Sequence, residues 1–250
     1  MLPYASLLIK PASGSCNMAC RYCFYRDVSE RREVPNLGRM SDTVMERLIC
    51  RALEESERGC SFAFQGGEPT LAGLDFFRRF VETVRAHNQR NLPVQYAIQT
   101  NGLLIDDEWA AFFARERFLV GVSLDGDRET HNAARVTAQD KGTFDAVLRS
   151  IDRLRRAGVD FNILCVVTSY TARHAERVYR FFRRQGFDYL QFIPCLDPLE
   201  EERGGYFWSL TPERYASFLT RTFDLWYAEM AAGKRVSVRN FDNWLGILLG

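Results

Sequence analysis

Three cysteines, Cys16, Cys20 and Cys23, share one short segment of the chain in a C-x3-C-x2-C spacing. The segment follows an apolar, strand-like stretch over residues 5–9. Three thiolates this close together can hold three irons of a [4Fe-4S] cluster, and because such a cluster usually takes four cysteines, one iron is left for a non-protein ligand. An open iron is a reactive iron, by the same reasoning that separates catalytic from structural zinc sites. The spacing therefore predicts a catalytic iron–sulfur centre.

A structural zinc site is the main alternative for these cysteines. Zinc normally takes four Cys or His ligands in two closely spaced pairs, and this sequence offers no second pair. The histidines that could complete the site are distant from the cysteine segment: His87, His131 and His174. The other four cysteines are scattered and indicate small apolar packing residues: Cys50, Cys60, Cys165 and Cys195. We therefore favour the cluster over zinc.

Composition excludes several classes of function. The 250 residues carry 33 basic and 32 acidic side chains, so the net charge of +1 creates no field of the kind that attracts nucleic acid. The N-terminus lacks the features of a signal peptide, and no apolar run approaches the roughly 18 residues of a membrane span. Seven cysteines, an odd number, favour metal or thiol chemistry in a reducing compartment over disulfides. We expect a cytoplasmic protein with no nucleic-acid or membrane partner.

Strand-like and helical segments alternate along the chain. The apolar, β-branched runs predict strands at 5–9, 61–65, 94–100, 118–124, 160–168 and 189–194. Helical spacing predicts helices at 41–57, 73–89, 106–116, 142–157, 171–185 and 212–232. This alternation is typical of a parallel sheet with crossover helices, and six units are too few for the eight of a closed barrel. The predicted fold class is α/β, an open, partial (β/α)6 TIM-like barrel.

The unusual motifs of the chain fall where the predicted strands end, which is where barrels of this kind carry their chemistry. Gly66 and Gly67 would let backbone approach a ligand closely, because neither carries a side chain. Ser123, near the end of a predicted strand, offers a hydroxyl, and Arg135, about a dozen residues further on, offers a forked guanidinium that suits a carboxylate. An isolated arginine is usually a surface residue, so the sequence chemistry alone gives Arg135 little weight. We expect the motifs at these strand ends to line one mouth.

The cysteine segment with Tyr22 before its last cysteine, followed by Gly66-Gly67-Glu68-Pro69, resembles the radical S-adenosylmethionine (SAM) superfamily. Within it, further stretches resemble the anaerobic sulfatase-maturating enzymes: Phe-Gln-Gly-Gly-Glu-Pro-Thr, Ile-Gln-Thr-Asn-Gly, Gly-Val-Ser-Leu-Asp-Gly, Phe-Asn-Ile-Leu-Cys-Val-Val-Thr and Gln-Phe-Ile-Pro-Cys-Leu-Asp-Pro. The likeness covers nearly the whole chain. It implies the radical SAM type of partial barrel and an oxidoreductase that cleaves SAM to a 5′-deoxyadenosyl radical. The product would be Cα-formylglycine, made from a Cys or Ser of a sulfatase.

The resemblance also implies roles for particular residues. Cys16, Cys20 and Cys23 would hold the [4Fe-4S] cluster, whose open iron takes the amino and carboxylate groups of SAM. The remaining contacts to SAM are expected from the backbone at Tyr22, from Gly66 and Gly67, from Ser123 and Arg135 around the ribose and carboxylate, and from Leu196 at the adenine. The expected partners are a peptide or unfolded sulfatase as substrate and a reductant such as flavodoxin or ferredoxin.

The family also carries a cysteine-rich C-terminal domain with two further [4Fe-4S] clusters and an acidic general base. We expect residues 1–235 to form the radical SAM core and residues 236–250 to begin that C-terminal domain, the rest of which is missing from this sequence. No catalytic base can be named from the residues present, and Asp197 is the first candidate should one be needed. Two alternatives stay open: another radical SAM peptide modifier, which forms thioether or carbon–carbon crosslinks, and a noncatalytic module that binds a cluster or a peptide.

Overall fold

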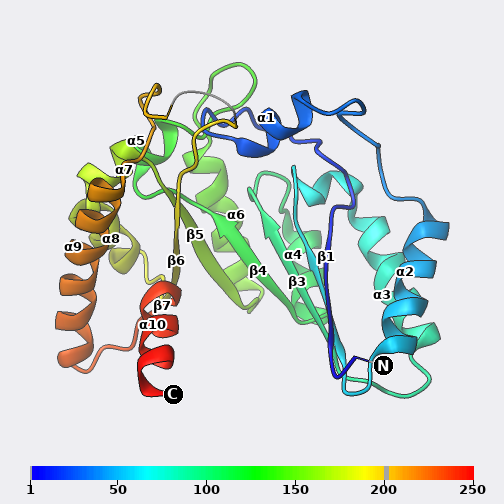
Figure 1. Cartoon of the computed structure of the whole chain (residues 1–250). Coiled ribbons are helices and arrows are strands. Elements are labelled where there is room, and N and C mark those ends of the chain that lie inside the picture. Colours follow the sequence, from blue (N-terminus) through cyan, green and yellow to red (C-terminus); the bar gives the residue numbers. More distant parts are fainter. Residues whose placement is uncertain (1, 200–202) are drawn as a thin grey trace. The chain divides into compact units, whose positions relative to one another are not determined.

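The computed structural model describes residues 2–199 and 203–250, which form two compact units (Figure 1). The first unit takes in Met1–Asn17, Val28–Gly121 and Ser150–Asp160. The second takes in Met18–Asp27, Val122–Arg149 and Phe161–Gly250. The division falls inside the cysteine segment, so Cys16 belongs to the first unit, whereas Cys20 and Cys23 belong to the second.

The first unit is built on parallel strands with helical crossovers. Strand β1 (Ala5–Ile9) pairs with β2 (Cys60–Phe64), and β2 pairs with β3 (Val94–Thr100), both in parallel. Parallel neighbours need long crossovers, which here contain α2 (Asp42–Glu55) and α3 (Leu74–His87). The 3-10 turn η1 (Pro69–Ala72) and α4 (Asp107–Arg115) complete the connections.

Aromatic side chains form the core of the first unit. Phe64 on β2 packs against Phe77 and Phe80 of α3, with ring centroids 4.9 Å apart in both pairs. The rings meet edge to face, an arrangement that the quadrupoles of aromatic rings favour. This packing holds α3 against β2 and so fixes the point at which β2 ends and its glycine motif begins.

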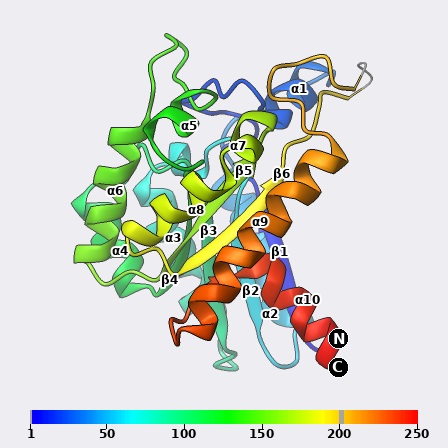
Figure 2. The ribbon, with the colours of Figure 1, turned by 90° about the vertical axis from the view of Figure 1, so that its left-hand side faces the viewer.

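The second unit repeats the same construction. Strand β5 (Phe161–Val167) pairs with β6 (Tyr189–Pro194), and β6 pairs with the short β7 (Ser237–Val238), again in parallel. Figure 2 shows α8 (Ala175–Arg184) and α9 (Pro212–Ala231) side by side. Phe192 of β6 joins them in the core. Its ring centroid lies 6.3 Å from that of Phe182 on α8 and 5.1 Å from that of Phe218 on α9. The remaining helices of this unit are α5 (Arg128–Asn132), α7 (Ser169–Arg173) and α10 (Arg239–Leu249).

The strand order of the sheet follows the chain, from β1 to β7. Strand β4 (Phe118–Ser123) and the helices α1 (Phe24–Glu30) and α6 (Phe144–Arg156) each contain residues of both units. All six predicted strands are present, each within one residue of its expected bounds. The two-residue β7 was not predicted, because so short a strand carries no alternating pattern.

The predicted helix at 171–185 is interrupted in the structure. His174 lies between α7 and α8 with φ −118° and ψ 28°, outside the helical region. Its backbone N–H donates to Thr171 O in a tight turn, and one of its ring nitrogens bonds Tyr170 O at 2.9 Å. Two other helices begin with side-chain caps: Ser41 caps α2, and Thr211 caps α9 with Pro212 at its first position.

Within residues 2–199 and 203–250, no helix is both long enough and apolar enough to cross a membrane.

Candidate active site at the strand ends

A buried carboxylate joins the ends of β2 and β3 in the first unit. Glu68, which directly follows the two glycines, is 1% exposed. Its Oε1 accepts hydrogen bonds from Thr70 N at 3.0 Å and from the hydroxyls of Thr70 and Thr100 at 2.6 and 2.7 Å. Its Oε2 accepts from Asn101 N at 2.7 Å. Burial raises the pKa of Glu68, and these hydrogen bonds offset part of that rise.

Asn101 carries this connection on to the cysteine segment. Its side-chain Nδ2 lies 3.7 Å from Cys16 Sγ and donates to Asn17 Oδ1 at 2.8 Å. Cys16 itself is exposed, while Asn101 is 8% exposed. The structure therefore brings the first predicted cluster ligand into contact with the motif that follows β3.

Gly66 and Gly67 both have positive φ, at 89° and 50°, which favours glycine. A Cβ on Gly67 would lie 2.2 Å from Ser15 O and 2.8 Å from Gly14 C, so the backbone of the cysteine segment occupies that space. The three atoms nearest to a Cβ on Gly66 would all belong to the flexible side chain of Lys10, with its Cγ at 2.6 Å. Glu68 N also donates to Ser15 O at 2.7 Å. The glycine turn thus packs directly against the residue that precedes Cys16.

In the second unit, the segment around Cys20 is held against the segment around Arg135. Ala19 N donates to Val136 O at 2.8 Å, and Arg21 N donates to Ala134 O at 2.9 Å. The two donors flank Cys20 and the two acceptors flank Arg135, so these two residues are neighbours across the pairing. Cys23 N in turn donates to Cys20 O at 3.1 Å.

Arg135 is buried in a charged network and is not the surface residue that its type alone suggested. It is 7% exposed, and its Nε donates to Asp125 Oδ2 at 2.8 Å. Asp125 is fully buried; it also accepts from the Tyr22 hydroxyl and from Val166 N at 2.9 Å. Burial by itself lowers the pKa of Arg135, but the negative charges of Asp125 and Cys20 are among the causes that raise it overall. Burial also raises the pKa of Tyr22, so its hydroxyl stays protonated and donates to Asp125.

His131 braces the same network in its neutral form. Its Nδ1 accepts from Asp125 N at 3.3 Å, and its Nε2 lies 3.0 Å from Thr143 Oγ1. Because the Thr143 hydroxyl donates to Arg135 O, it accepts from His131, which places the proton on Nε2. Burial lowers the pKa of His131 well below its usual range, with the Arg135 charge adding to the effect.

The remaining predicted residues, Ser123, Leu196 and Asp197, lie at or beyond the ends of β4 and β6. Ser123 ends β4 and is half-buried, and Leu196, directly after β6 and Cys195, is 61% exposed. Asp197 accepts from Gly204 N at 2.8 Å and from Ser209 Oγ at 2.6 Å, so both carboxylate oxygens organise its own loop. That use weakens its candidacy as a base.

The four scattered cysteines fit their interpretation as packing residues. Cys60, Cys165 and Cys195 are buried, and Cys50 lies half-buried on α2. Burial raises the pKa of all four thiols, that of Cys195 to about 12, so they stay protonated and unreactive. Among the described residues, no three Cys, His, Asp or Glu side chains stand together as a ready-made metal site. The ligand role of Cys16, Cys20 and Cys23 therefore stays a prediction.

Glu68 and Asp125 lie within the sequence motifs, but no role was predicted for either. An acidic residue at the end of an apolar strand was the available signal, because such a carboxylate, once buried, must find donors. His131 was considered only as a distant zinc ligand, and the structure gives it hydrogen-bonding partners instead.

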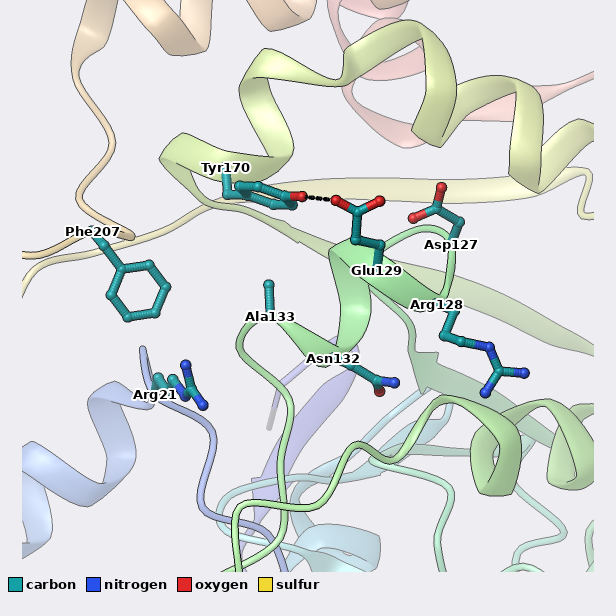
Figure 3. Close-up of a pocket in the computed structure, with 8 residues that line it drawn as sticks. All are labelled: Arg21, Asp127, Arg128, Glu129, Asn132, Ala133, Tyr170 and Phe207. Atoms are coloured by element: carbon teal, nitrogen blue, oxygen red, sulfur yellow. Dashed lines mark hydrogen bonds between the residues drawn. The ribbon is translucent and has the colours of Figure 1, made fainter.

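A pocket of about 810 Å³ lies in the second unit beside α5 and α7 (Figure 3). Arg21, Asp127, Arg128, Glu129, Asn132, Ala133, Tyr170 and Phe207 line it. Each charged side chain of the lining has a partner of opposite charge: Asp140 for Arg21, Asp145 for Arg128, and Arg177 for both acids. Figure 3 also shows the Tyr170 hydroxyl donating to Glu129. The pocket is therefore electrostatically satisfied and, unlike the strand ends, contains none of the predicted site residues.

Comparisons with known proteins show the family to which this chain belongs. The family model of the radical SAM superfamily matches residues 11–182, a range that includes the cysteine segment, both glycines and Arg135. The chain belongs to the radical SAM superfamily, and the predicted fold class is confirmed.

Individual relatives identify a more specific family within the superfamily. The cysteine-type anaerobic sulfatase-maturating enzyme of Clostridium perfringens (strain 13 / Type A) is 52% identical over 250 residues, which is 100% of this chain and 68% of the relative. The serine-type anaerobic sulfatase-maturating enzyme of Klebsiella aerogenes is 34% identical over 239 residues, 94% of this chain and 57% of the relative. The solved structure of native anSMEcpe with bound AdoMet and Cp18Cys peptide matches with a TM-score of 0.94 and 49% identity, over 99% of this chain and 66% of that one.

Within the superfamily, the chain belongs to the anaerobic sulfatase-maturating enzymes. It spans about two thirds, 66% to 68%, of the length of the cysteine-type relatives that it matches.

Proposed function

We propose that this protein oxidises a cysteine of a sulfatase peptide to Cα-formylglycine by radical SAM chemistry. The observation that carries the proposal is the likeness along the whole chain to cysteine-type relatives at 49% to 52% identity, against 34% for the serine-type relative. The anSMEcpe structure with bound AdoMet and Cp18Cys peptide supports both SAM and a peptide as ligands. We expect an unfolded sulfatase segment as the natural substrate, flavodoxin or ferredoxin as the reductant, and a cytoplasmic setting, where thiols stay reduced.

We propose that Cys16, Cys20 and Cys23 hold the [4Fe-4S] cluster. The chemistry that such a cluster supplies is the one-electron reductive cleavage of SAM to methionine and a 5′-deoxyadenosyl radical. The three cysteines fit such a cluster, because thiolates are its usual ligands. The chain also places a hydrogen-bond donor beside one of these cysteines and a cationic residue beside another. Asn101 Nδ2 lies 3.7 Å from Cys16 Sγ, and Arg135 is the neighbour of Cys20 across the two paired backbone segments.

Two of the residues proposed to contact SAM, Arg135 and Tyr22, are held by the network around Asp125. Asp125 takes the Nε of Arg135, which leaves the outer edge of the guanidinium for a carboxylate. Tyr22, whose backbone we propose meets the adenine, is fixed through its hydroxyl to the same Asp125. Gly66 and Gly67 would present backbone to the methionine end, with Ser123 at the ribose and Leu196 at the adenine.

The oxidation itself removes two electrons and two hydrogens from the substrate. One hydrogen atom goes to the 5′-deoxyadenosyl radical, a proton goes to a base, and the second electron goes to an acceptor. Water then replaces the sulfur of the resulting thioaldehyde and releases hydrogen sulfide. We propose that the base and the electron acceptor belong to the C-terminal part of the relatives beyond this chain, where two further [4Fe-4S] clusters are expected, and that residues 236–250 lead into that part.

The test is a comparison of this chain with the full-length protein under anaerobic conditions. Each is incubated with SAM, a reductant and a sulfatase-type peptide, and both 5′-deoxyadenosine and peptide mass are measured. We expect the chain alone to release 5′-deoxyadenosine slowly without changing the peptide, and the full-length protein to couple the two. A peptide with Ala in place of the target Cys is the control, and a Ser peptide tests the choice of substrate. No modification by the full-length protein would refute the proposal.

A further inference from the structure

We propose that Asn101 is a positioning residue that tunes the reduction potential of the cluster through an N–H···S hydrogen bond to Cys16. The proposal rests on the cluster assignment above and adds a role for Asn101 in the redox chemistry of the cluster. Nδ2 of Asn101 and Sγ of Cys16 are 3.7 Å apart, within the reach of a hydrogen bond to sulfur, and the two residues are 85 positions apart in the chain.

The orientation of the Asn101 amide is fixed by its other partners. Its Oδ1 accepts from Leu103 N at 2.9 Å, and a backbone N–H can only donate, so oxygen occupies that end. Nδ2 therefore faces the cysteine segment with two hydrogens. One is directed to Asn17 Oδ1 at 2.8 Å, and the other is available to Cys16 Sγ.

The backbone of Asn101 is held equally firmly. Its N–H donates to Glu68 Oε2 at 2.7 Å, and the other oxygen of that buried carboxylate is bonded to Thr70 and Thr100. Asn101 is itself 8% exposed. The donor thus belongs to a rigid, buried support and needs no rearrangement to meet the thiolate.

Hydrogen bonds to a ligand sulfur stabilise the more negative, reduced state of an iron–sulfur cluster and so raise its potential. Asn101 would therefore make the cluster easier to reduce by the cellular reductant. We expect an effect of about tenfold on the equilibrium constant for one-electron reduction, which corresponds to about 59 mV.

The test is a redox titration of the reconstituted 250-residue chain, followed by electron paramagnetic resonance without SAM or peptide. Asn101→Leu keeps the size of the side chain and removes the donor, and it should lower the midpoint potential by about 59 mV at an unchanged iron content. Asn17→Ala is the matched control, since it removes the other acceptor of Nδ2 and leaves the contact to Cys16. We expect its potential to equal that of the wild type.

Equal potentials for Asn101→Leu and wild type would overturn the proposal, and so would an equal shift in Asn17→Ala, because the loop position alone would then explain the effect. Should Asn101→Leu lose iron, Asn101→Ser serves in its place. Its hydroxyl can still accept from Leu103 N but is too short to reach Cys16, and it is expected to show the same fall in potential. A wild-type chain that binds no iron would refute the proposed cluster itself, an outcome distinct from equal potentials.

Discussion

A single methyl group added at Gly67 should destabilise the first unit and disturb the segment that leads into Cys16. The residue has φ +50°, and a left-handed conformation costs an alanine about 1–2 kcal/mol. Its Cβ would also stand 2.2 Å from Ser15 O and 2.9 Å from Gly14 O, and both neighbours are backbone atoms that cannot rotate away. Overpacking of this kind costs about 1–3 kcal/mol. Together the two effects predict that Gly67→Ala lowers the free energy of unfolding by about 2–5 kcal/mol.

Gly66→Ala is the matched control for this substitution. Gly66 also has a positive φ, at 89°, so its backbone strain is of the same kind. The three atoms nearest to its Cβ would be Lys10 Cγ, Cδ and Cε, which belong to a flexible side chain that can move aside. We therefore expect Gly66→Ala to lower the free energy of unfolding only by the cost of the left-handed backbone conformation, about 1–2 kcal/mol.

Urea denaturation of the apo chain measures the difference, with iron content after anaerobic reconstitution as a second readout. Gly67→Ala should have the lower denaturation midpoint and bind less iron, because the displaced Ser15 also accepts the 2.7 Å hydrogen bond from Glu68 N. Equal free energies of unfolding for the two variants, together with equal iron content, would refute the reasoning that Gly67 is required by the cysteine segment.

Further predictions concern the two buried networks and the cluster ligands. Asp125→Ala should destabilise the second unit by about 3–5 kcal/mol in urea denaturation, since it leaves the buried charge of Arg135 unpaired, and a loss below 1 kcal/mol would contradict this. Glu68→Ala should cost at least about 2 kcal/mol, because two buried backbone N–H groups lose their acceptor, and Glu68→Gln should restore part of it. As pH falls below 6.5, the free energy of unfolding should decrease by up to about 1.4 kcal/mol per pH unit, because His131 takes up a proton in the unfolded chain but not in the buried folded site. His131→Gln should remove this pH dependence. Replacing Cys16, Cys20 or Cys23 by Ala should abolish cluster reconstitution, whereas Cys60→Ala should preserve it. The iron content of each variant after anaerobic reconstitution tests this prediction.

Local patterns in the sequence were enough for the six predicted strands and for the choice of chemistry. Period-two and helical spacings depend only on neighbours along the chain, which is why all six predicted strands are found. The C-x3-C-x2-C spacing and the glycine pair are also local features, and they led to the superfamily that the comparisons support.

The burial and pairing of polar residues were decided only by the tertiary structure. Nothing local distinguishes Arg135 from a surface arginine until Asp125 and Tyr22 enclose it. Likewise, Asn101 meets Cys16 across 85 positions only because β2 and β3 end side by side and Glu68 joins them. Buried polar groups must find partners, and the partners are supplied by whichever elements pack against them. That packing is a long-range property, so local patterns could identify residues capable of chemistry but not the partners that hold them in place.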